Sequence, residues 1–231
     1  IAGQYAGIQA RLKLLVGDQA RVAEMNDAIY QSALRSRGSF EQMADAVTKI
    51  GMTAKEAFPD SKQVVPFVEG IQKLFAIGGT GAQQQGDAML QLTQALGSGK
   101  LQGDEFRSSM ENAPLLAQSI ANEMGLSVGQ LKEMSSQGLI TADIIKNALL
   151  GSAEETNEKF AEIPMTFAEV GQSVQNQLIQ AFQPVLEQLS TLPQSGEFQA
   201  FIEGVGIAIR GLAAATQGSI ALIGAAFAGL R

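Results

Sequence analysis

Three helix N-termini are predicted within about forty residues, between residues 99 and 150, and this spacing constrains the fold more than any other feature. Gly103-Asp104, Ser127 and Thr141 each precede an apolar run. Asp, Ser and Thr side chains accept hydrogen bonds from the free N–H groups of a first helical turn, so they mark helix starts. The sequence therefore predicts a compact set of short helices joined by tight turns.

The rest of the first 150 residues repeats this helical pattern. Apolar residues recur every three or four positions in four ranges, 19–37, 40–50, 64–75 and 83–97. These ranges, the short turns between them and two longer apolar stretches after residue 165 predict an all-α fold. We expect a compact multi-helix bundle of short capped helices, followed by longer C-terminal helices.

Several boundaries can be predicted locally, and one segment cannot be assigned. Gly38 is expected to end the first helix, and Ser39 to cap the next one. Thr53 is expected to begin a short helical turn towards Phe58. Residues 9–16 are too few for their apolar period to distinguish a helix from a strand.

The composition excludes much of enzyme chemistry. The chain contains no cysteine and no histidine, so it has no disulfide, no thiol nucleophile, no Cys/His zinc site and no imidazole base. Aromatic residues make up only 6% of the chain, which predicts a core of Ala, Leu, Ile, Val and Met. A net charge of −7 argues against nucleic-acid binding. We expect no enzymatic activity, no cofactor and no metal.

Apparent sites have simpler interpretations. Gly97-Ser98-Gly99-Lys100 is similar to part of a phosphate-binding loop, but Gln94 and Leu101 occupy two positions that the motif requires to be Gly and Ser or Thr. A helix C-terminal turn is the better interpretation. Asp104 and Glu105 are expected to complement a helix dipole. The acidic run 154–158 is expected to form a solvated face. Six methionines are expected to fill gaps in the core: Met43, Met52, Met89, Met110, Met124 and Met134.

The chain changes character after residue 150. Residues 151–165 are polar and acidic, and Pro164 blocks a continuous helix. A long apolar stripe follows from about 166 to 192, with Pro184 predicting a kink. We therefore predict a helical domain at 1–150, a linker at 151–165, and a C-terminal part at 166–231 that contains a long amphipathic helix and a Gly/Ala-rich apolar segment.

Residues 211–230 carry no charge and are rich in Gly, Ala, Ile and Leu, so they meet the length criterion for spanning a bilayer. Small residues at four-residue steps, Gly211 to Ala215 and Ala221 to Ala225 to Gly229, would let helices approach closely in lipid or in protein. Thr216, Gln217 and Ser219 weaken the membrane interpretation, because polar groups are costly in a bilayer. Burial in protein or self-association is the favoured alternative.

No signal peptide is visible at the start of the chain. The sequence begins with Ile1 and ends in an apolar run, so we interpret it as a fragment of a longer protein.

An ordered series of motifs runs through the first 150 residues. The main motifs are Gly99 to Arg107, Glu111 to Pro114, Gly125 to Leu131 and Gly138 to Asp143. Shorter motifs lie upstream at 37–40, 49–52 and 76–82. In order and spacing, the series resembles the N-terminal domain of tailed-phage tape measure proteins over residues 8–150. The residues that carry the motifs are expected to be structural: Gly99, Leu101, Gly103, Phe106, Arg107, Pro114, Gly125 and Gly138.

The resemblance implies a structural protein of a phage or prophage tail that helps to set tail tube length and leaves the virion with the DNA. It implies tail tube, tail tip and tail assembly chaperone proteins as partners, a homo-oligomer among the alternatives, and a place in the tail lumen or tip. The host membrane becomes a partner if residues 211–230 insert. A helical assembly adaptor and a membrane-active protein remain alternatives, whereas an accompanying peptidoglycan hydrolase is disfavoured within this chain.

Overall fold

A computed structural model describes residues 2–99 and 104–190, and this part of the chain is all-α, as predicted. It contains eleven α-helices, one 3-10 helix and no β-strand. The helices are α1 Ala2–Val16, α2 Gln19–Arg35, α3 Phe40–Thr53, α4 Val64–Ile77, α5 Ala82–Gly97, α6 Asp104–Asn112, α7 Pro114–Glu123, α8 Val128–Ser136, α9 Ala142–Gly151, α10 Ala153–Ala161 and α11 Phe167–Ser190, with η1 at Ser61–Gln63.

Capping side chains start the helices where the sequence predicts. The Ser39 hydroxyl caps α3, and the Thr141 hydroxyl accepts from the Ile144 N–H at 3.3 Å to cap α9. At the start of α8, Ser127 and Gln130 form a capping box in which each side chain accepts from the other's backbone N–H. α6 begins at Asp104, so the three predicted N-termini are confirmed.

Five helices, α1, α4, α5, α7 and α8, are followed by a glycine with positive φ. Gly79, Gly99, Gly125 and Gly138 have φ between 63° and 76°, a conformation that lets the chain leave a helix and turn sharply. The Gly97-Ser98-Gly99 sequence therefore ends α5, as expected.

The end of α2 differs from the prediction. The helix stops at Arg35, and Arg37 has a φ of 58°, the conformation expected of Gly38. A non-glycine residue there costs roughly 1–2 kcal/mol. Gly38 is close to α4 instead, since a Cβ on it would lie 3.2 Å from Cγ of Gln72 and that side chain would have to shift.

Two other local predictions are corrected or settled. Residues 9–16 belong to helix α1. Thr53 ends α3 instead of beginning a new turn.

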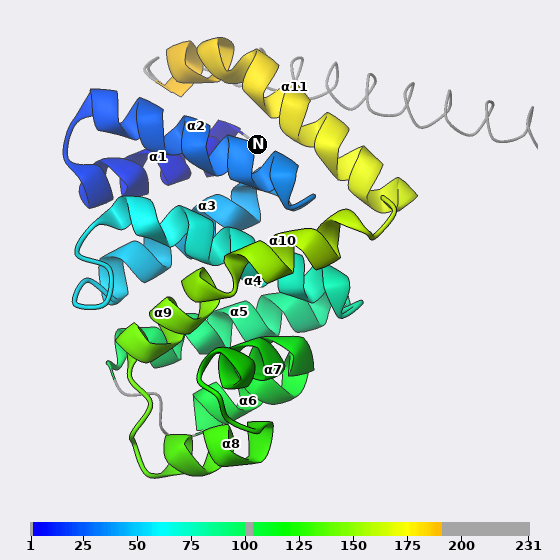
Figure 1. Cartoon of the computed structure of the whole chain (residues 1–231). Coiled ribbons are helices and arrows are strands. Elements are labelled where there is room, and N and C mark those ends of the chain that lie inside the picture. Colours follow the sequence, from blue (N-terminus) through cyan, green and yellow to red (C-terminus); the bar gives the residue numbers. More distant parts are fainter. Residues whose placement is uncertain (1, 100–103, 191–231) are drawn as a thin grey trace, which may run out of the picture.

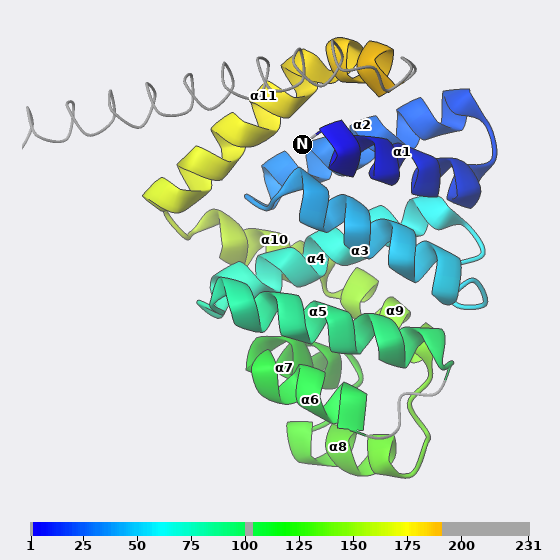
Figure 2. The same ribbon diagram turned by 180° about the vertical axis from the view of Figure 1, so that it is seen from behind.

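α4 lies at the centre of the molecule, between α1–α3 on one side and α6–α8 on the other (Figures 1 and 2). It contacts α2, α3, α7, α9 and α10. The largest completely buried side chains include four phenylalanines, so the core depends on aromatic residues more than the composition suggested: Phe40, Phe67, Phe75 and Phe106.

The methionine prediction is confirmed only in part. Met43 and Met110 are buried, and Met89, Met124 and Met134 pack against the core. Met52, however, is 40% exposed near the end of α3, so it fills no gap.

Between residue 152 and the end of the described part at residue 190, the chain forms two helices. α10 packs on α4, and the three glutamates at 154, 155 and 158 lie on its exposed side. After a turn that contains Pro164, α11 crosses α1 and α2 (Figure 1) and includes Pro184. The proposed division into domains at 151–165 stays a prediction.

The last apolar segment lies outside the described residues, and with it Gly211, Ala215, Ala221, Ala225 and Gly229. None of the helices in 2–99 and 104–190 is long and apolar enough to cross a membrane.

Candidate functional site

The structure places six of the eight motif residues at helices or helix boundaries. Phe106 is completely buried in α6, and Arg107 pairs with Asp104 on the surface of the same helix. Pro114 is the first residue of α7, where its missing N–H costs no helical hydrogen bond. Gly99, Gly125 and Gly138 form the turns described above, while Leu101 and Gly103 lie outside the described residues.

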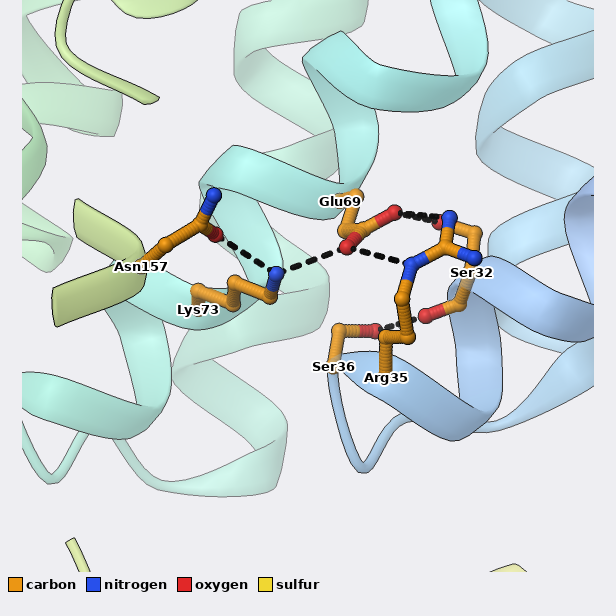
Figure 3. A network of polar contacts seen from close by, with 6 residues as sticks. All are labelled: Ser32, Arg35, Ser36, Glu69, Lys73 and Asn157. Carbon is orange, nitrogen blue, oxygen red and sulfur yellow. Dashed lines mark hydrogen bonds and ion pairs between the residues drawn. The ribbon is translucent and has the colours of Figure 1, made fainter. Parts of the chain in front are cut away.

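The most unusual site of the core is a buried carboxylate on α4 that sequence reasoning missed. The side chain of Glu69 accepts hydrogen bonds from the Ser32 hydroxyl at 2.8 Å and from Arg35 Nε and Nη2 at 3.1 and 2.7 Å. The Lys73 ammonium donates to the same carboxylate at 2.7 Å. Figure 3 shows these donors converging on Glu69 from α2 and from the next turn of α4.

The donors determine the charge of this carboxylate. Burial raises the pKa of Glu69, but hydrogen bonds from Arg35, Lys73 and Ser32 lower it, and the net pKa lies below its ordinary value of 4.5. The hydrogen bond to Glu69 in turn raises the pKa of Arg35. Glu69 is therefore ionised at neutral pH and held between two cations.

Lys73 connects this network to α10. Its ammonium donates to Oδ1 of Asn157 at 2.7 Å, and it lies 5.7 Å from the ring centroid of Phe160. The guanidinium carbon of Arg37 lies 4.4 Å from the same centroid, so the ring is approached by two cations. The arrangement joins α2, α4 and α10.

The chemistry of this network is structural. A general base works best with a pKa near the working pH, whereas Glu69 is shifted in the opposite direction. Its carboxylate already accepts four hydrogen bonds, and its side chain is only 10% exposed. The sequence did contain a signal, because Glu69 and Lys73 are the two charged residues of an otherwise largely apolar helix and lie four positions apart.

The pKa shift of Glu69 predicts a pH dependence of stability. Because the pKa is lower in the folded chain than in the unfolded chain, the ionised form favours folding. This stabilisation is complete above the ordinary pKa of 4.5 and is lost as the pH falls through the folded value. We expect the free energy of unfolding, measured with urea, to fall as the pH drops below about 5. The Glu69→Gln variant should lose less over this range, and an equal loss in both proteins would contradict the assignment.

Two surface grooves lie elsewhere. One, of about 520 Å³, lies between α1, α2 and η1, with Met25 and Val65 in its lining and the Glu24–Lys62 ion pair beside it. The other, of about 280 Å³, lies between α3, α4 and α5. The hydrogen bond to Glu24 raises the pKa of Lys62, so this amine stays protonated and is a poor nucleophile at neutral pH.

No ionisable cluster suggests a metal site either. Across residues 2–99 and 104–190, no group of three or more acidic side chains is placed to hold a metal ion.

Within residues 2–99 and 104–190, these features describe an all-α protein in which a polar network around Glu69 joins α2, α4 and α10. A family model described as tape measure protein matches residues 1–187. The chain belongs to the tape measure protein family, and it is therefore a phage tail component that associates with other tail proteins and is linked to tail length. The match confirms the predicted resemblance and extends it beyond residue 150. The comparisons with curated proteins and with solved structures found no match.

Proposed function

We propose that residues 1–190 form a compact docking unit of a tape measure protein, and that other helical parts of the protein measure the tail. The observation that carries the proposal is the way α1–α11 fold back around a common core. A molecular ruler needs an extended chain, in which an α-helix advances about 1.5 Å per residue.

The length of an extended helix and the size of a compact domain distinguish a ruler from a docking unit. About 190 residues in one straight helix would span roughly 285 Å. A compact domain of that size has a radius of gyration of roughly 16 Å. Residues added to or removed from this unit would therefore disturb its core without a proportional change in its length.

Electron microscopy of tails from two in-frame deletions tests the proposal. Deleting about 60 helical residues of the tape measure gene outside 1–190 should shorten the tail by about 90 Å. Deleting α6 to α8, residues 104–136, should abolish tail assembly. Tails shortened by about 50 Å in the second case would show that this unit is itself part of the ruler. Unchanged tails in the first case would favour an assembly adaptor.

The partners that fit this role are tail assembly chaperones and the proteins of the tail tube and tail tip. We place the unit in the tail lumen or at the tip, assembled in the host cytoplasm and released with the DNA. Gold labelling of a tag fused before residue 1, viewed in assembled tails, separates the two locations. Label confined to one end indicates the tip, and label along the tube indicates the lumen.

Residues 211–230 are proposed to pack against protein or to self-associate, and a role in membrane passage is the alternative, supported by their lack of charge over a length sufficient for a bilayer. A peptide of residues 204–231 should release dye from liposomes if the alternative is right. Absence of binding and leakage would remove this role and favour packing against protein.

A further inference from the structure

Amide side chains of α11 make hydrogen bonds to α2 and to the backbone between α2 and α3. Among its described side chains, residues 167–184, the two buried ones are Asn176 and Ile179. Its apolar stripe is only partly covered, since Val170, Val174 and Phe182 are half-buried and Phe167 is 85% exposed. Ile179 belongs to the hydrophobic core and Phe182 packs against it, but residues 167–184 bury fewer apolar side chains than α4 does, so their hydrophobic stabilisation is smaller.

Asn176 makes the central contact. Its amide nitrogen donates to the Gly38 carbonyl at 2.8 Å, and its oxygen accepts from the Phe40 N–H at 3.1 Å. The Asn176 side chain thus provides hydrogen-bond partners for two backbone groups between α2 and α3 that have none within a helix. Further along, Asn26 of α2 donates to Oε1 of Gln183 at 3.5 Å. Water can replace each of these partners, because backbone and amide groups are well solvated, so separation leaves few groups unsatisfied.

The start of α11 is held differently. Arg37 donates to the Ile163 carbonyl at 2.7 Å and lies 3.9 Å from the Glu169 carboxylate, while its guanidinium stacks on Phe160. Pro164 prevents α10 and α11 from merging into one helix. One end of α11 is therefore held by a largely buried cation, and residues 170–184 are held by amide hydrogen bonds and by the apolar contact of Ile179 and Phe182 with the core.

We propose that α11 is a releasable strap that separates from α1–α3 about the hinge at 162–166 while the core stays folded. This inference does not depend on the proposed docking function. Once released, α11 has no tertiary support, and an isolated helix of this length is marginal in water. Its backbone amides then exchange with solvent, although those of α3 and α4 remain protected.

Native-state hydrogen exchange on the 231-residue protein tests the proposal. We expect the amides of α11 to exchange at least tenfold faster than those of α3 and α4, with little dependence on low denaturant concentrations. Asn176→Ala should speed exchange in α11 about tenfold more and leave α4 unchanged.

Gln177→Ala provides the matched control, because Gln177 is the exposed neighbour of Asn176 on the same helix. It should leave exchange unchanged. The strap proposal is overturned if α11 and α4 of the unaltered protein exchange at the same rate with the same denaturant dependence. It is also overturned if Asn176→Ala speeds exchange in α3, α4 and α11 together.

Discussion

Replacing Glu69 with alanine should lower the free energy of unfolding by about 3–5 kcal/mol. The substitution removes the acceptor shared by Ser32, Arg35 and Lys73. Most of this loss should come from Lys73, because its side chain is only 8% exposed. Its charge would remain in the core without an ion-pair partner, with Asn157 as its remaining hydrogen-bond acceptor. Urea denaturation at neutral pH, followed by circular dichroism, measures the loss.

Two further variants identify the cause. The double variant Glu69→Leu with Lys73→Met replaces both charges by apolar groups, so it should recover most of the lost stability. Glu133→Ala, at an exposed position of α8, should change stability by less than about 0.5 kcal/mol. A loss below about 1 kcal/mol for Glu69→Ala would show that water reaches Lys73 and that the network does not stabilise the packing of α2, α4 and α10.

Replacing Phe106 with alanine should cost about 3–5 kcal/mol, the range for a large aromatic side chain removed from a core. Phe106 is completely buried in α6, which packs against α5 and α7. The nine-residue α6 cannot persist in isolation, so the cavity should also loosen the helices around it. Thermal and urea unfolding measure the stability loss, and hydrogen exchange locates it.

Arg107→Ala is the neighbouring control within the same motif. Its ion pair with Asp104 lies on the surface, with the two side chains 60% and 87% exposed, and such pairs contribute little. We expect a change below about 0.5 kcal/mol. If Arg107→Ala destabilised the protein as much as Phe106→Ala, this arginine would have a role that the described contacts do not contain.

The sequence predicted those features of the fold that depend on local chemistry. Ser39, Ser127 and Thr141 were identified as caps because each acts on a helix that begins at the next residue. The turn glycines Gly99 and Gly138 follow the same logic, since the requirement for positive φ is also local.

Features that depend on distant parts of the chain were not predicted. Ser32 and Glu69 are 37 positions apart, and no local pattern links them. The conformation of Arg37 belongs to the same class: glycine is the better residue for positive φ, but the arginine side chain reaches Phe160 and Ile163 from that position. Local preference alone favours Gly38 for the positive φ at the end of α2. Arg37 adopts it instead because its side chain contacts Ile163, 126 positions later in the chain.

The connection between Lys73 and Asn157 has a consequence for synthesis on the ribosome. These residues are separated by 84 positions, so at roughly 5–20 residues per second the partner emerges about 4–17 seconds later. Ser32, Arg35 and Glu69 are all made before Lys73, and their hydrogen bonds can form at once. In the nascent chain, water therefore accepts the hydrogen bond of the Lys73 ammonium group until Asn157 of α10 has been synthesised. The central helix α4 acquires its final contacts only near the end of translation of this unit.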